Sequence, residues 1–245
     1  MTDTALTVNV PAVPAKAEPP VVLFDAEARN RFPFEVREGT KTYETAHIFN
    51  PLSDERYMQW LRAFKMRGNE DALDEQSREA TCALWDELIH EVENIAVSEG
   101  LDFREVIPDP EKLEAISAFV AVAIAADIER VTGSRCFTPD ATQTVATEAW
   151  VNGEITTQTH VLKRVSVEWQ KKYSRIAAKR FKQERIGGLR RQPQLEYVPQ
   201  DHKFGEMYDE MIVSNTGFAG RVPLRFKTVV VEHLFGERLS QKKSD

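Results

Sequence analysis

Apolar and polar side chains alternate in a short stretch near the start of the chain. Apolar residues occupy every second position from Phe32 to Val36, which is the period-two pattern of a half-buried strand. The dipeptide Gly39-Thr40 follows, and glycine at the first central position suits a type II′ turn because it accepts a positive φ. Alternation resumes from about residue 42 to residue 49. The pattern therefore predicts a β-hairpin.

A second alternating stretch lies in the later half of the chain. Residues 144–151 and 155–162 flank the dipeptide Asn152-Gly153. Asn-Gly between alternating runs is the strongest short-range signal for a hairpin. We therefore predict a second hairpin here.

Helical spacing of apolar residues follows each hairpin. Ser53 and Ser166 each precede such a pattern, and serine at this position caps a helix by accepting a backbone N–H. The apolar residues of the first helix are Tyr57, Trp60, Leu61 and Phe64, and those of the second are Trp169, Tyr173, Ile176 and Ala177. Each hairpin is thus expected to lead into an amphipathic helix.

Four more helices are expected from the same spacing. They cover about residues 71–96, closed by Gly100, then 110–131, 204–213 and 223–235, with Gly236 as the final cap. The helix at 110–131 has little polar face over its middle turns, so we expect it to be buried in a core.

The two hairpin regions match each other when 113 is added to the residue numbers of the first. Five of 28 positions are then identical, among them His47 with His160 and Ser53 with Ser166. The turns also coincide, and Pro110 falls on Pro223. One interpretation is chance; the other, which we adopt, is duplication of one unit, with the two copies packed by pseudo-twofold symmetry.

The expected architecture is an α+β fold, helix-rich overall, of two tandem β-hairpin-plus-helices units. We place a disordered N-terminal arm at residues 1–20, because it is rich in Ala, Val and Pro, the first unit at 21–135 and the second at 136–245.

Composition restricts the class of protein further. The chain has 245 residues, of which 42% are apolar and 29% charged, with a formal net charge of −7; this is typical of a globular protein and not of a fibre. Cys82 and Cys136 lack C-x-x-C spacing, so they predict reduced thiols. The start of the chain lacks a signal peptide, and the longest apolar run, Ala118–Ala126, is too short to cross a bilayer. We expect a cytoplasmic protein.

Charge is distributed unevenly along the chain. Residues 171–191 contain nine cations and one acid, a net charge of +8, whereas residues 70–111 contain fourteen acids and two cations. The nine cations are the candidate partner-binding residues: Lys171, Lys172, Arg175, Lys179, Arg180, Lys182, Arg185, Arg190 and Arg191.

Three interpretations of this basic segment are open. It is a solvated helix face, a nucleic-acid surface on which Tyr173 and Phe181 stack on bases, or a partner of the acidic region at 70–111. The third, which we favour, pairs the two regions within one chain or head-to-tail between copies, which would make the protein a homo-oligomer.

Motifs for catalysis and cofactor binding are absent from the sequence. It has no phosphate-binding glycine loop, no nucleophile elbow and no zinc-type histidine spacing. The paired His47 and His160 allow a symmetric metal or acid–base site, but buried structural histidines are the favoured interpretation. We expect a protein without enzymatic activity, metal or cofactor.

The stretch from Phe34 to Leu61, FEVREGTKTYETAHIFNPLSDERYMQWL, resembles the opening of bacteriophage tail assembly chaperones and related small phage tail proteins. In that group a hairpin with a glycine turn precedes a proline, a short acidic segment and an amphipathic helix. The resemblance implies a binding or assembly protein that holds tail tape-measure or tail tube components in the host cytoplasm or in the virion. It transfers no catalytic residues, and it leaves the nucleic-acid-binding alternative open.

Overall fold

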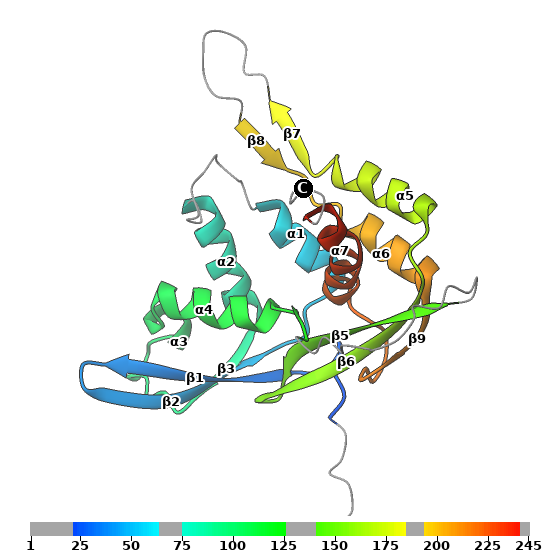
Figure 1. The fold of residues 1–245 in the computed structure, drawn as a ribbon. Helices are drawn as coiled ribbons and strands as arrows, with labels where there is room; N and C mark the ends of the chain where they lie inside the picture. The colour runs from blue at the N-terminus through cyan, green and yellow to red at the C-terminus, as the bar shows by residue number, and fades with distance from the viewer. Residues whose placement is uncertain (1–21, 64–74, 126–140, 185–193, 241–245) are drawn as a thin grey trace, which may run out of the picture.

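A computed structural model describes residues 22–63, 75–125, 141–184 and 194–240 of the chain. The predicted arm at residues 1–20 and the predicted unit boundary at residue 136 lie outside the described residues. The described elements form an α+β fold of helices and antiparallel sheets, so the predicted fold class is confirmed (Figure 1).

The first unit runs from β1 to α4. Its elements are β1 (Asn30–Glu38), β2 (Lys41–Phe49), α1 (Asp54–Ala63), α2 (Glu75–Leu88), β3 (Ile89–Glu93), α3 (Phe103–Val106) and α4 (Asp109–Val120). The three strands form one antiparallel sheet in the order β1-β2-β3. The short strand β4 (Ala123–Ile124) then leads out of this unit.

The second unit follows a similar order, with an added pair of short strands and without a counterpart of α3. Its elements are β5 (Thr142–Val151), β6 (Glu154–Lys163), α5 (Val167–Ala177), β7 (Phe181–Glu184), β8 (Gln194–Tyr197), α6 (Asp201–Met211), β9 (Ile212–Thr216) and α7 (Leu224–Ser240). Its sheet has the order β4-β5-β6-β9, and β7 pairs only with β8. In both units the helices lie on one side of the sheet (Figure 1).

Both predicted hairpin turns are present. Glu38 pairs with Lys41 and Val151 with Glu154, so each turn has two residues. Gly39 has a φ of 61°, while Asn152 and Gly153 have φ values of 51° and 92°. Two successive positive φ values are what a type I′ Asn-Gly turn requires.

The two predicted serine caps are also confirmed. Ser53 Oγ accepts the backbone N–H of Arg56 at 3.2 Å, and Ser166 Oγ accepts that of Trp169 at 3.3 Å. These bonds satisfy amides that the first helical turn leaves without an intrahelical acceptor.

Two helices are shorter than the sequence predicts. The helix expected to reach residue 96 ends at Leu88, and the one expected to reach residue 131 ends at Val120. In each case the next residues form a strand that adds to a sheet edge, β3 to β2 and β4 to β5. Pairing with a distant strand outweighed helical propensity, which is a weak preference. The predicted caps were also wrong: Gly100 lies beyond β3, and Gly236 lies inside α7.

The two units share strand register as well as element order. β3 and β9 pair with β2 and β6 at equivalent positions, and each pairing has an irregularity at the same place, between Ile48 and Phe49 and between Val161 and Leu162. Asn94 and Gly217, directly after these strands, both have positive φ. The numbering offset grows from 113 to 123 between the hairpin and β9, because the second unit carries the β7–β8 segment.

Side-chain contacts repeat in the last part of each unit. Lys112 Nζ lies 2.8 Å from Asp86 Oδ1, and Lys227 Nζ lies 2.7 Å from Asp209 Oδ1. The proline whose carbonyl starts the final helix is Pro108 in the first unit and Pro223 in the second. The predicted match of Pro110 with Pro223 was therefore wrong by two residues. The correspondence between the two units therefore extends from the hairpins to the last helix, although α3 has no helical counterpart in the second unit.

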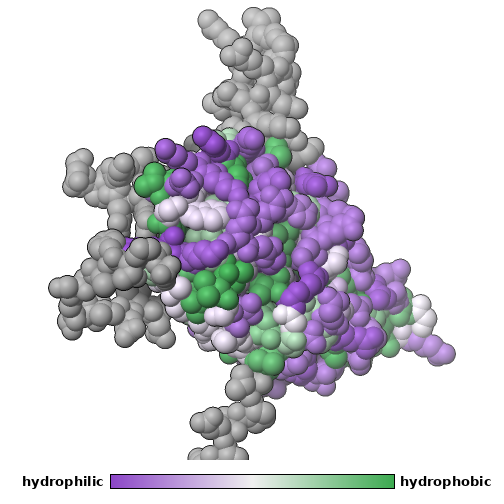
Figure 2. Space-filling model, turned by 90° about the vertical axis from the view of Figure 1, so that its right-hand side faces the viewer, coloured by the Kyte–Doolittle hydropathy of each residue, from purple (hydrophilic) through white to green (hydrophobic). Residues whose placement is uncertain are grey.

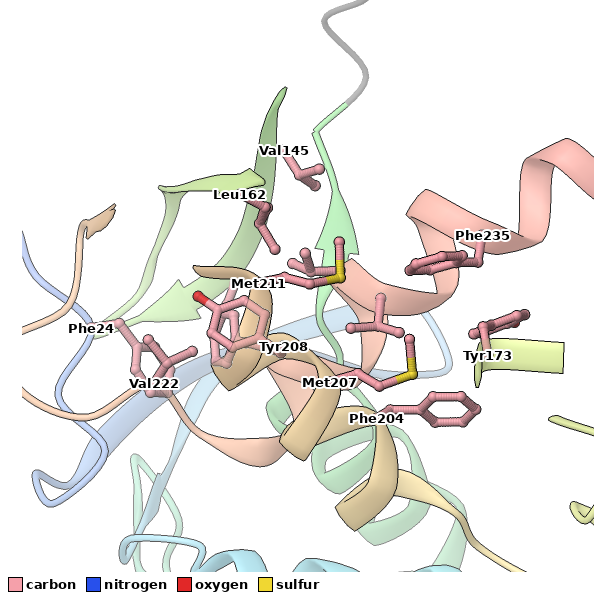
Figure 3. Packing of buried hydrophobic residues seen from close by; sticks show 14 of the residues in the cluster. Phe24, Val145, Leu162, Tyr173, Phe204, Met207, Tyr208, Met211, Val222 and Phe235 are labelled. Atoms are coloured by element: carbon pink, nitrogen blue, oxygen red, sulfur yellow. The ribbon is translucent and has the colours of Figure 1, made fainter. Parts of the chain in front are cut away.

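Each unit has its own hydrophobic core between sheet and helices. The first contains Phe49, Trp85 and Ile116, and the second contains Phe204 and Tyr208 among the residues shown in Figure 3. Phe49 stacks on Phe119 with ring centroids 4.6 Å apart. The cores are large enough to stabilise both units through buried apolar area.

The units are arranged head to tail, so the predicted pseudo-twofold packing was wrong. The turn of the second hairpin meets the start of the first, where Asn30 Nδ2 donates to the Trp150 carbonyl at 2.6 Å and Asn152 N–H donates to Asn30 Oδ1 at 2.7 Å. A twofold axis would repeat these contacts with the roles exchanged. Gln143, the counterpart of Asn30, instead bonds to Lys163, and in Figure 1 the turn of the first hairpin lies far from the second unit.

The ends of the first unit are built into the second. β4 adds to β5 through Ala123 opposite Glu148, so the segment after α4 extends the second sheet. Phe24, ahead of β1, exchanges two backbone hydrogen bonds with Gly217 and Ala219. Its ring is buried in the second core (Figure 3).

A helix of the first unit covers the start of α7. Asp54 Oδ1 accepts the backbone N–H of Leu224 at 2.8 Å, and its second oxygen pairs with Arg221. The contact therefore joins the first turn of α1 to the N-terminus of the last helix. Arg225, one residue further along, is buried against the rings of Phe24 and Phe119, and burial lowers its pKa to about 10.

Candidate functional site

The nine cations predicted to bind a partner fall on α5 and on the segment after it. The structure describes the side chains of five of them, Lys171, Lys172, Arg175, Lys179 and Arg180. Lys182 lies in β7, but its side chain is outside the described part, as are residues Arg185, Arg190 and Arg191. The candidate site is therefore built from α5.

Helix α5 is amphipathic, which turns its cations outward. Tyr173 is buried on the inner side, where its ring stacks on Phe235 with centroids 5.0 Å apart and lies 5.3 Å from Phe204. Trp169 and Ile176 pack against the same core. Fixing the helix by this inner face holds its opposite face in solvent.

Two of the five cations are paired with acids of their own unit. Lys172 Nζ contacts both carboxylate oxygens of Glu210, at 2.8 and 2.7 Å, and Arg180 pairs with Glu232. Arg180 also lies over the ring of Phe204. Burial raises the pKa of the nearby Asp201 carboxyl, and the charge of Arg180 partly offsets that rise.

The other three cations, Lys171, Arg175 and Lys179, are exposed. Within the described ranges no carboxylate lies at ion-pair distance from them. A shallow groove of about 400 Å³ runs beside them, lined by Val167, Gln170, Lys171, Ser174 and Arg175. We call this surface the cationic face of α5. Figure 2, which views the side of the molecule carrying α5 and α6, shows a largely hydrophilic surface with hydrophobic areas among the charges.

These contacts change two of the interpretations of the basic segment. Pairing with the acidic region at 70–111 within one chain was wrong for Lys172 and Arg180, which use Glu210 and Glu232 instead. Stacking of Tyr173 on a nucleic-acid base was also wrong, because its ring is only 6% exposed. The side chain of Phe181, the other predicted stacking residue, lies outside the described residues.

His47 and His160, which the internal repeat pairs, both lie in the cores of their units. In the first unit Trp85 Nε1–H donates to His47 Nδ1 at 3.1 Å, and His47 Nε2 lies 3.1 Å from Glu111 Oε1. Because indole nitrogen only donates, His47 carries its ring proton on Nε2 and donates it to Glu111. The histidine thus bridges the sheet to two helices.

His160 makes the corresponding bridge in the second unit. Its Nδ1 lies 2.7 Å from Tyr208 Oη and its Nε2 lies 3.0 Å from Thr147 Oγ1. The Thr147 hydroxyl donates to the side-chain oxygen Oε1 of Gln158, which can only accept. The same hydroxyl therefore accepts a hydrogen bond from His160 Nε2–H. Both histidines therefore have the same tautomer and a structural role, with Trp85 replaced by Tyr208.

Among the described residues, no cluster of three or more histidine, cysteine or acidic side chains has the arrangement of a metal site. Over the same ranges, none of the helices combines the length and apolar character needed to cross a bilayer.

The chain was also compared with protein families, curated proteins and solved structures. None of them matches it.

The sequence analysis missed an exposed surface on the first unit, at the start of its last helix. Leu101 and Val106 are 53% and 42% exposed, although both are apolar, and Glu105 and Asp109 beside them are exposed acids. We call this surface the acidic end of the first unit. Its acids belong to the region at residues 70–111, which the sequence analysis predicted as the partner of the basic segment, but the exposed apolar residues beside them were not predicted.

The stability of the second unit is expected to depend on pH through His160. Burial lowers its pKa from 6.5 to about 4, so between these values the unfolded chain binds more protons than the folded one. The free energy of unfolding should therefore fall by up to about 3 kcal/mol as the pH drops from 6.5 to 4. Chemical unfolding at several pH values measures this slope.

The matched variant for this experiment is His160→Gln. Its amide nitrogen replaces the Nε2–H donor toward Thr147 but does not titrate, so the slope between pH 6.5 and 4 should become shallower. Carboxylates titrate alike in both proteins and cancel in the comparison. Equal slopes would show that His160 is not the group responsible.

Proposed function

We propose that this chain is a non-enzymatic binding protein that acts in assembly, and that the cationic face of α5 is a contact surface for an acidic protein. The observation that carries the proposal is the separation of the cations of α5 into two groups. Lys172 and Arg180 are paired with acids of their own unit, while Lys171, Arg175 and Lys179 are exposed, the first two beside a shallow groove that also contains Val167.

An exposed apolar side chain within this face supports binding of a protein over binding of nucleic acid. Val167 is 69% exposed, and an apolar residue next to unpaired cations is typical of a mixed protein interface. Single-stranded nucleic acid is instead held by exposed aromatic side chains that stack on bases, and Tyr173 is buried. The resemblance of residues 34–61 to phage tail assembly chaperones supports tail tape-measure or tail tube proteins as partners.

The proposal is tested by co-expressing the chain with the tape-measure and tail tube proteins of the genome that encodes it. We expect a complex that survives nuclease and that Lys171→Glu/Arg175→Glu weakens about tenfold or more, since charge reversal replaces attraction by repulsion. Isothermal titration calorimetry measures the change.

The control is Arg78→Glu/Lys203→Glu, which makes the same change in net charge at exposed positions on α2 and α6. It should bind like the wild type. Binding that is equally weakened by the control, or that nuclease abolishes, would contradict the proposal.

A further inference from the structure

The contact between the two units uses different surfaces on each of them. The first unit contributes the first turn of α1, through Asp54, and the second contributes the N-terminus of α7, through Arg221 and Leu224. Because the contact is not reciprocal, each unit also carries the surface that the other one uses. One copy of each surface is therefore left without a partner unit in a single chain.

The free counterpart on the second unit is the cationic face of α5. Adding 113 to the numbers of α1 places Asp54 on Val167, and Met58 on Lys171. Met58 is 3% exposed, whereas Val167 and Lys171 are exposed. The position of Asp54, which meets the second unit in α1, is thus occupied in α5 by a residue that is open to solvent.

The free counterpart on the first unit is its acidic end. Matching Pro108 to Pro223 places Val106 on Arg221, and Asp109 on Leu224. These are the positions that Asp54 contacts at the internal junction. In the first unit they are exposed, next to Leu101 and Glu105.

We infer that the cationic face of α5 docks on the acidic end of the first unit of a second copy of this chain, which continues the internal junction from one molecule to the next. Each surface has an exposed apolar side chain, Val167 on one and Val106 on the other. The charges beside Val167 are positive, and those beside Val106 are negative. In this arrangement the surface that carries Lys171 and Arg175 approaches the surface that carries Glu105 and Asp109. The inference rests on the proposed function and names a partner for the same face.

The contact between copies does not reproduce every part of the internal junction. The segment after α4 adds β4 to the edge of β5, but the equivalent positions after α7 are still helical, since α7 extends to Ser240. No strand is therefore supplied by α7 to the corresponding edge of β1. The association should accordingly be reversible and sensitive to salt, because exposed charges are screened at high ionic strength.

Sedimentation velocity on the purified chain over a range of concentrations tests the inference. Lys171→Glu/Arg175→Glu and Glu105→Lys/Asp109→Lys should each weaken self-association about tenfold or more. An equimolar mixture of the two variants should associate again, because every junction in the mixture joins opposite charges. A misfolded variant could not give this rescue.

A wild-type chain that stays monomeric, or variants whose mixture remains dissociated, would overturn the inference. Failure of self-association with retained binding of tail proteins would leave the proposed function intact. Self-association without binding of tail proteins would support the contact between copies and contradict tail proteins as partners.

Discussion

The Trp85→Ala variant is expected to lose about 4 to 8 kcal/mol of unfolding free energy, the largest effect among the proposed substitutions. Trp85 is fully buried, and truncation of a buried tryptophan to alanine costs about 3–5 kcal/mol. The variant also leaves His47 Nδ1 without its donor in a dry core, which adds about 1–3 kcal/mol. Urea unfolding measures the change.

The Trp85→Phe variant separates these two contributions. It keeps an aromatic ring in the core but removes the N–H donor, so a loss of about 1–3 kcal/mol is expected. Tyr208→Phe makes the matching change in the second unit, because Tyr208 bonds to His160 at 2.7 Å. If either variant unfolds like the wild type, the corresponding histidine bridge does not stabilise the fold.

The second large effect is expected at Gly217. Its φ is +89°, and a Cβ atom there would lie 2.9 Å from Gln158 Cα and 3.0 Å from the Thr157 carbonyl oxygen. Gly217→Ala therefore combines left-handed backbone strain of about 1–2 kcal/mol with overpacking of about 1–3 kcal/mol against backbone that cannot move aside. We expect a total loss of about 2 to 5 kcal/mol in chemical unfolding.

Gly100→Ala is the control for Gly217→Ala. Gly100 has almost the same φ, +86°, but a Cβ there meets no atom within 4 Å. It should lose only the strain contribution of about 1–2 kcal/mol. Equal losses in the two variants would mean that the close approach to β6 costs nothing.

Signals within a few residues were sufficient to predict much of the fold. The turns at Gly39 and Asn152 and the caps at Ser53 and Ser166 each depend on one residue and its immediate neighbours. The internal repeat also predicted that His47 and His160 are equivalent. The structure shows that each of them links its sheet to a helix by a matching hydrogen bond.

Features that depend on distant partners could not be predicted in this way. The strand at Ile89–Glu93 forms because the edge of β2 is available to it, and helical spacing alone could not reveal that edge. Lys172 and Arg180 pair with acids 38 and 52 residues away. The head-to-tail order of the units depends on surfaces that no local pattern describes, such as the docking of the Asn152 turn on Asn30.

The exchange of β4 and Phe24 between units has a consequence for the cooperativity of folding. The second sheet takes its edge strand from the chain that follows α4, and the second core takes a ring from the chain that precedes β1. The second half of the sequence therefore lacks parts of its own sheet and core. Although the two units share one arrangement of strands and helices, they are joined through these segments and should melt together in one cooperative transition.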